Sequence, residues 1–141
     1  MAEECIFCQV VAGEAEASVV HEDNTTMAFM DLRQTNAGHT LIVPRRHIRD
    51  IYELDDDTAA AVIAATTRVA RAVRDAFDPD GINIWQSNGA AAGQEVFHIH
   101  FHVLPRRNDD GLLKFYPSKP DYPPRRILDE RAAKIRAALD G

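Results

Sequence analysis

Residues 96–104, with the sequence VFHIHFHVL, alternate strictly between two sets of side chains. Successive side chains of a β-strand point to opposite faces, so a strand here would place Val96, His98, His100, His102 and Leu104 on one face. The other face would carry only phenylalanine, isoleucine and valine, which predicts packing against a hydrophobic core. The first face predicts a site, because this short run holds three of the six histidines of the chain.

The rest of the sequence predicts further short strands and two helices. Two strands around the polar turn EDN occupy 19–31, a buried strand occupies 39–44, and an alternating strand occupies 82–87. An amphipathic helix lies within 55–81, opens with acidic residues and ends at Asp-Pro-Asp-Gly, and a last helix spans 125–139. A chain of 141 residues suits one domain. We therefore expect a single α+β domain with a mainly antiparallel sheet.

Charge and hydropathy exclude several classes of function. The formal net charge of −6 leaves no basic surface for nucleic acid, so a phosphate-bearing ligand must be small. No apolar run approaches the roughly 20 residues of a membrane span. The start MAEECIFCQ is acidic where a secretory signal would be basic and then apolar. We expect a cytoplasmic protein that contacts neither nucleic acid nor membrane.

Three histidines on one strand face admit three kinds of role. Same-face neighbours stand about 6.5 to 7 Å apart, so two rings can chelate one ion, whereas three would need strain. A catalytic metal site needs an open coordination position and usually has a carboxylate nearby on the chain, whereas Val103, Leu104 and Pro105 follow this run. Another role is nucleophilic catalysis, in which one neutral imidazole attacks phosphorus and a neighbouring histidine donates a proton. This role accounts best for histidines at successive positions of one strand face. A purely structural row is the least favoured role.

The two cysteines, Cys5 and Cys8, form a C-x-x-C pair. In a reducing compartment this spacing favours metal binding or redox chemistry over a structural disulfide.

The segment HIHFHVL, 98–104, resembles the signature of the histidine triad (HIT) family. Other family blocks follow in the same order: CIFCQVVAGE (5–14), AFMDL (28–32), GHTLIVPRRH (38–47) and AGQEVFHIHFHVLPR (92–106). The resemblance implies a HIT-like fold with a five-stranded, mainly antiparallel sheet, one long central helix and a C-terminal helical tail. It implies a single HIT domain over 1–141, with a core of about 5–106 and a C-terminal extension of about 107–141.

The chain is most similar to small bacterial members of the Hint-type branch. That branch implies a homodimeric hydrolase or transferase attacking the α-phosphate of purine nucleoside phosphoramidates or related nucleotides. By resemblance His100 is the nucleophile that forms a nucleotidyl-histidine intermediate. His102 holds the phosphate and assists the leaving group, and His39 orients the triad or relays a proton. Dimerisation is expected through the long helix and a sheet edge.

The resemblance also assigns the nucleotide contacts. Asp31 corresponds to the residue that bonds the ribose hydroxyls, which suits a carboxylate acceptor. Gln94 and the loop before it, with Gly93, correspond to the phosphate-binding segment. The walls around the base correspond to Ile6, Phe7, Val10, Phe29 and Leu32.

Two positions depart from the family pattern. Where Hint-type proteins often carry asparagine in the phosphate loop, this chain has Ser87 followed by Asn88, and either side chain could make that contact. Where many relatives have serine or threonine before the triad, this chain has Glu95. An ionised Glu95 can only accept hydrogen bonds, so it either favours a cationic or amine leaving group or points into solvent.

In zinc-bearing relatives the C-x-x-C pair binds the metal with two histidines. The corresponding residues here are Cys5, Cys8, His47 and His98, which implies one structural zinc per chain because protein fills all four positions. The chemical step would need no metal. The remaining histidine, His21, is predicted to be exposed and without a role.

Two alternative functions stay open. The segment HVLPR with Arg106, together with the arginine-rich tail, resembles dinucleoside polyphosphate hydrolases or phosphorylases of the same family. A non-enzymatic nucleotide-binding regulatory protein would use the same pocket without turnover.

Overall fold

The computed structural model describes residues 5–112 and 120–139. The chain divides into two compact units, Met1–Asp110 and Gly111–Gly141, which are described separately. Parts of the predicted C-terminal extension, 113–119 and 140–141, lie outside the described residues, as do residues 1–4. The prediction of a single domain over the whole chain stays a prediction.

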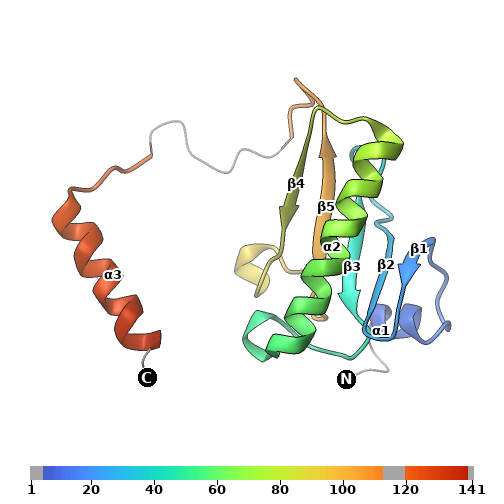
Figure 1. Cartoon of the computed structure of the whole chain (residues 1–141), viewed down its shortest axis with the longest axis horizontal. Helices are drawn as coiled ribbons and strands as arrows, with labels where there is room; N and C mark the ends of the chain where they lie inside the picture. The colour runs from blue at the N-terminus through green and yellow to red at the C-terminus, as the bar shows by residue number, and fades with distance from the viewer. Residues whose placement is uncertain (1–4, 113–119, 140–141) are drawn as a thin grey trace. The chain divides into compact units, whose positions relative to one another are not determined.

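The first unit is built on one five-stranded antiparallel sheet (Figure 1). Its strands are β1 (Val19–Glu22), β2 (Thr26–Met30), β3 (Thr40–Pro44), β4 (Gly81–Trp85) and β5 (Phe101–Arg106), in the order β1-β2-β3-β5-β4. The predicted five-stranded, mainly antiparallel sheet is confirmed.

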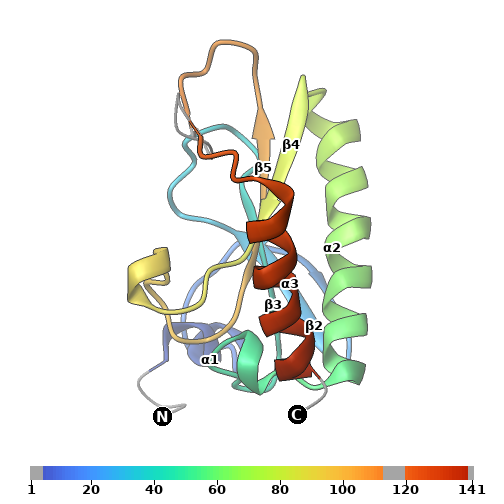
Figure 2. The same cartoon turned by 90° about the vertical axis from the view of Figure 1, so that its left-hand side faces the viewer.

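The helix α2 (Asp56–Phe77) covers one face of this sheet (Figures 1 and 2). It begins where the Asp55 side chain accepts a hydrogen bond from the Thr58 backbone N–H, and ends where Asp78 adopts the left-handed conformation. A buried cluster joins the helix to the sheet and consists of Ala28, Ile42, Val62, Ala65, Val69, Val73 and Val103. The predicted long helix is therefore present, with Phe77 as its last residue.

The opposite face of the sheet packs against α1 (Ile6–Val11), which lies across the sheet from α2 in Figure 2. The buried residues of this second cluster are Cys5, Phe7, Val10, Met27, Phe29, Leu41 and Val43. Sequence reasoning did not predict α1, although Phe7 and Val10 stand three residues apart, as one helical face requires. Neighbouring β2 residues, Ala28 and Phe29, contribute to different clusters because strand side chains alternate.

The predicted strand over the histidine run is wrong in its first half. β5 begins only at Phe101, and its ladder with β3 covers Thr40 to Ile42. Before Phe101 the polar groups find partners outside any ladder: the Ile99 N–H donates to the Ile48 carbonyl, and the His98 ring bonds the Pro44 carbonyl. Proline at the end of β3 has no N–H to continue the ladder. The three histidines therefore do not form one straight row.

The second unit contains α3 (Arg125–Leu139), which matches the predicted last helix. Arg126 and Glu130 form an ion pair one turn apart on it. Within the described part of the chain, no helix combines the length and apolarity that crossing a membrane requires.

Candidate active site

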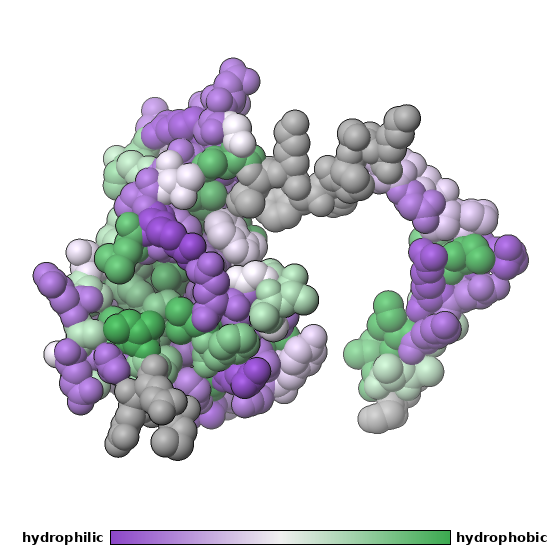
Figure 3. Space-filling model, turned by 180° about the vertical axis from the view of Figure 1, so that it is seen from behind, coloured by the Kyte–Doolittle hydropathy of each residue, from purple (hydrophilic) through white to green (hydrophobic). Residues whose placement is uncertain are grey.

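A cavity of about 410 Å³ opens on the side of the sheet that α1 covers. This volume is in the range of small-molecule sites. Figure 3 shows the first unit from the side away from α2, and apolar surface gathers in the middle of this face of the unit, beside hydrophilic side chains. The cavity is lined by Ile6, Phe7, Val10, Glu16, Ala17, Phe29, Met30, Asp31, Leu32, Arg33, Leu41, Gly93, Glu95, Val96, His100 and His102.

Most of the predicted nucleotide-binding residues meet at this cavity. Those that line it are Ile6, Phe7, Val10, Phe29, Asp31, Leu32, Gly93, Glu95, His100 and His102. The register places His102 opposite Leu41 of β3 and opposite Trp85 of β4, which explains why it shares the α1 side. Their roles as nucleotide contacts stay predictions.

Ser87, Asn88 and Gln94 are not among the lining residues. The Asn88 side chain accepts from the Ile51 N–H at 2.8 Å and exchanges hydrogen bonds with the Gln86 side chain. Gln94 is only 3% exposed; its amide accepts from the Gly89 N–H and donates to the Arg49 carbonyl. In this structure Asn88 and Gln94 hold the loop in shape, and a direct phosphate contact by any of the three stays a prediction.

The ring of His100 has a defined tautomer. Its Nδ1 lies 2.8 Å from the His98 carbonyl oxygen, which can only accept, so Nδ1 carries the proton. The Nε2 lone pair is then unprotonated. Burial lowers the pKa of His100, with carboxylates of Asp31 and Glu95 opposing that shift and Arg33 adding to it. His100 is therefore uncharged at neutral pH, as a nucleophile must be.

His102 is oriented from two sides. Its ring stacks on Trp85, with centroids 4.2 Å apart and planes 5° from parallel. Its Nδ1 lies 3.0 Å from Nε2 of His39, whose own Nδ1 bonds the Arg33 carbonyl at 3.2 Å. His39 is thus protonated at Nδ1 and accepts from His102, which leaves Nε2 of His102 as a proton acceptor. Burial, followed by the charges of His100, His39 and Arg33, lowers the pKa of His102 to about 3.

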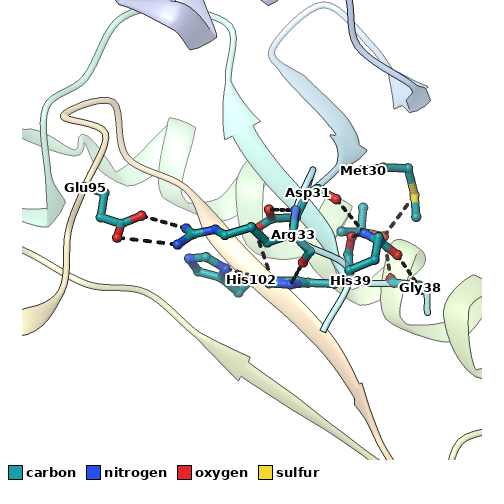
Figure 4. A network of polar contacts seen from close by, with 9 residues as sticks. Met30, Asp31, Arg33, Gly38, His39, Glu95 and His102 are labelled. Atoms are coloured by element: carbon teal, nitrogen blue, oxygen red, sulfur yellow. Dashed lines mark hydrogen bonds and ion pairs between the residues drawn. The ribbon is translucent and has the colours of Figure 1, made fainter. Parts of the chain in front are cut away.

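Asp31 completes this network, as Figure 4 shows. It is 7% exposed, accepts from the Arg33 N–H at 2.8 Å, and places its other oxygen 3.5 Å from His39 Nε2. Ligand atoms of Asp31, His39 and His102 lie within 4.8 Å of one another, so they could also hold a metal ion. The carboxylate that the sequence did not show after His102 is contributed from the end of β2. The spacing of residues along the chain gave no sign that Asp31 would lie near His102, because the two residues are far apart in the sequence.

A second cluster unites the four predicted zinc ligands. The ligand atoms of Cys5, Cys8, His47 and His98 lie within 4.8 Å of one another. Nδ1 of His98 is 3.4 Å from Cys5 Sγ and 3.5 Å from Cys8 Sγ, and Nδ1 of His47 is 3.2 Å from Cys8 Sγ. A tetrahedral zinc with ordinary bond lengths separates sulfur and nitrogen ligands by about 3.5 Å. The residues present therefore fit a zinc ion.

The other nitrogen of His98 supports this fit. Nε2 donates to the Pro44 carbonyl at 2.8 Å, which turns the Nδ1 lone pair toward the sulfurs. Burial lowers the pKa of His98 to about 4, which keeps the ring neutral, as a metal ligand must be. His21 lies apart from both clusters and contacts Asp23.

The fold, the three histidines and the apolar cavity define a class of protein. Residues 12–109 match the family model described as the HIT domain, which is more than half of the chain. The protein therefore belongs to the HIT family, as residues 98–104 predicted.

Two known proteins are similar to this chain over most of their length. Protein hit of Bacillus subtilis (strain 168) is 46% identical over 105 residues, which covers 74% of this chain and 72% of that protein. Adenosine 5'-monophosphoramidase hnt1 of Schizosaccharomyces pombe is 33% identical over 135 residues, covering 94% and 98% of the two chains.

Two solved structures are similar over almost the whole chain. A HIT family protein from Bacillus anthracis has a TM-score of 0.91 at 34% identity, covering 98% of this chain and 99% of that one. A Zn-bound histidine triad family protein from Mycobacterium smegmatis has a TM-score of 0.74 at 38% identity, with the same coverage.

Proposed function

We propose that the protein hydrolyses nucleotides at the α-phosphorus, with purine nucleoside phosphoramidates as its substrate class. One observation carries the proposal: the unprotonated Nε2 of His100 is held at the wall of a nucleotide-sized cavity by the bond from Nδ1 to the His98 carbonyl. The phosphoramidase activity named for the Schizosaccharomyces pombe relative supports the choice of substrate.

Binding of a nucleotide would use both the apolar and the polar side chains that line the cavity. The base packs between the apolar side chains, which are Ile6, Phe7, Val10, Phe29 and Leu32. Asp31 accepts from the ribose hydroxyls with the lone pairs that the Arg33 N–H leaves free. This arrangement brings the α-phosphate against His100 and His102.

The reaction would proceed in two displacements. Nε2 of His100 forms a bond to phosphorus while the bond from phosphorus to the amine nitrogen breaks, and the amine leaves with that electron pair and a proton. The negative charge of bound phosphate raises the pKa of His102, so its Nε2 takes up a proton from solvent when substrate binds and donates that proton to the leaving amine. Water then attacks phosphorus, gives a proton back to His102 and displaces His100.

Substitution of the nucleophile tests the proposal. We expect His100→Ala to lose turnover of adenosine 5'-phosphoramidate, by at least about 10³-fold, while it still binds adenosine monophosphate. The parent enzyme, quenched soon after mixing, should show in intact mass spectrometry the added mass of one nucleotidyl group. His21→Ala is the matched control, because His21 lies on β1 away from the cavity. Full activity of His100→Ala would end the proposal.

A metal-dependent hydrolase is the second candidate, because Asp31, His39 and His102 could hold an ion. It predicts loss of activity when a chelator removes all metal from folded protein, and recovery when metal is added back. The proposed mechanism predicts that chemistry at His100 continues without metal.

Two further alternatives are a polyphosphate hydrolase or phosphorylase of the same family and, from a different class, a non-enzymatic regulatory protein. Arg106 ends the HVLPR segment that resembles polyphosphate-hydrolysing relatives. In this structure its side chain donates hydrogen bonds to Asn83 and Asp110 at 2.6 to 2.8 Å. A comparison of kcat/KM for adenosine phosphoramidate and diadenosine polyphosphate decides between these substrates. A purely regulatory protein predicts nucleotide binding without turnover.

We also propose one structural zinc per chain and a homodimer. The zinc rests on the tetrahedral fit of its four ligands and on the Zn-bound relative. The dimer rests on the edge strand β4 and on α2, where Ile84 and Ile63 are 49% and 50% exposed.

A further inference from the structure

An ion pair joins two walls of the cavity. Arg33 lies two residues after Asp31, and Glu95 lies five residues before His100. Nη2 of Arg33 donates to Oε2 of Glu95 at 2.6 Å, and Nη1 lies 3.4 Å from Oε1 (Figure 4). Both residues line the cavity. The pair therefore connects the segment after β2 with the segment that leads into the histidines.

The pair is accessible to solvent and can be opened. The side chains of Arg33 and Glu95 are 70% and 64% exposed. Ion pairs with this exposure contribute little to stability and are screened by salt, so a charged ligand can compete with either partner.

The main chain of Arg33 is fixed, whereas its side chain reaches outward. Its N–H donates to Asp31, and its carbonyl accepts from His39. The guanidinium can therefore change partner without moving the residues that orient His102.

The location of the pair identifies the part of a substrate that would meet it. The base and ribose would occupy the apolar lining and Asp31, and the α-phosphate would lie against His100. The leaving group then projects from phosphorus toward solvent. The exposed residues of the lining are Ile6, Glu16, Leu32, Arg33, Gly93 and Glu95. Among the lining residues named above, Arg33 is the only arginine or lysine, so it is the group to which a negatively charged leaving group would bind.

We propose that Arg33 forms a subsite for a negatively charged leaving group, such as the carboxylate of an amino acid joined through its nitrogen to the nucleotide phosphorus. This inference rests on the proposed function. The Glu95 carboxylate, bonded to both terminal nitrogens of Arg33, occupies the position that the carboxylate of the substrate would take. On binding, Arg33 exchanges one carboxylate for the other, and Glu95 turns into solvent, away from the phosphate and Asp31.

The opposite assignment, Glu95 as a seat for an ammonium group, fits less well. When a nucleotide is bound, the negative charges of its phosphate and of Asp31 attract Arg33 and repel Glu95. Arg33 therefore stays at the cavity, whereas Glu95 moves into solvent, out of reach of an ammonium on the leaving group.

Three substrates whose leaving groups are similar in size test the subsite. They are adenosine 5'-phosphoramidates of β-alanine, which ends in a carboxylate, of β-alanine amide, which is neutral, and of 1,3-diaminopropane, which ends in an ammonium. The quantity compared is the ratio of kcat/KM for the carboxylate to kcat/KM for the amide, at low ionic strength.

We expect the ratio to exceed one in the parent protein, to rise by up to about fivefold in Glu95→Gln, and to fall by a similar factor in Arg33→Gln, as for an exposed charge pair. The ratio for the ammonium substrate should move in the opposite direction. Arg74→Gln is the control, because Arg74 forms an equally exposed ion pair with Asp75 on α2, away from the cavity.

The same ratio in all four proteins, with turnover of the neutral substrate intact, overturns the subsite and leaves the proposed function standing. No turnover of any substrate by the parent protein overturns both. A ratio that rises in Arg33→Gln assigns the anion to another residue and also overturns the inference.

Discussion

The stacking of Trp85 on His102 is the closest ring contact of the site among the described residues. The indole of Trp85 packs flat against the imidazole of His102 and so restricts the plane of that ring. The hydrogen bond to His39 fixes the tautomer of His102. Neither contact is readable from sequence, since Trp85, His39 and His102 belong to three different strands or their ends. Trp85 was predicted only as part of a strand.

Replacing Trp85 with leucine should remove the stack while keeping an apolar side chain. We expect kcat/KM to fall about threefold to tenfold, the range of an aromatic pair contact. Trp85→Phe should recover most of the loss, and the thermal midpoint of both variants should be similar. Steady-state kinetics and thermal melts measure this, and equal activity of Trp85→Leu and the parent would contradict it.

The turn between β1 and β2 depends on Asp23, whose carboxylate accepts from the N–H groups of Thr25 and Thr26 and from the Thr26 hydroxyl. Burial raises the pKa of this carboxyl, but the hydrogen bonds outweigh it and lower the pKa to about 2. A carboxyl with a depressed pKa in the folded state stabilises the protein above its unfolded value, about 3.9, and loses that contribution as pH falls toward 2.

Asp23→Asn should therefore reduce the free energy of unfolding at pH 7, and the difference from the parent should shrink below about pH 4. The effect is modest because the side chain is 40% exposed. Urea unfolding of both proteins at pH 7 and pH 3 measures it, and loss of zinc at low pH cancels because it affects both. A difference that grows with acidification would contradict the assignment.

At the scale of elements, α1 depends on its surroundings. Six residues are far too few for an isolated helix in water. Phe7 and Val10 pack on the sheet, and Cys5 and Cys8 join the helix to His47 and His98. The helix also supplies walls of the cavity, namely Ile6, Phe7 and Val10, so a zinc ion at these ligands would hold that part of the cavity in place.

Protein purified without added metal should contain close to one zinc per chain by elemental analysis. Removal by a chelator should increase hydrogen exchange over residues 5–11 and raise KM by about tenfold, with kcat changed less than about twofold. Cys8→Ser should give the same pattern. A zinc content far below one, or a chelated protein with unchanged exchange, would contradict a structural zinc.

The sequence predicted most helices and strands of the first unit, but not all of them. Alternation and caps located β1 to β4 and α2, because those patterns are local. The first half of the histidine run failed because its polar groups bond residues such as Ile48 and Pro44, which are remote in sequence. Arg33 was missed for the same reason: its partner Glu95 lies 62 positions further on.

At the scale of the whole molecule, both edges of the sheet expose apolar side chains, and the proposed dimer would use the edge at β4. β4 exposes Ile84 beside α2, and β1 at the other edge exposes Val20 to 47%. We expect Ile84→Arg to weaken the dimer at least about tenfold in dissociation constant, because it buries a charge in an apolar contact. Val20→Arg is the control. Analytical ultracentrifugation across a dilution series measures both, and a dimer disrupted only by Val20→Arg would place the interface at β1.

His98 contributes to the two sites through different atoms. Its ring faces the sulfurs, whereas its main-chain oxygen holds Nδ1 of His100. Every amino acid possesses that oxygen, so the tautomer of His100, the proposed nucleophile, does not depend on the side chain at position 98. The four proposed zinc ligands and the proposed nucleophile can therefore change independently in evolution. We expect a relative without Cys5, Cys8 and His47 to retain the proposed chemistry at His100, provided that other packing holds α1 in place.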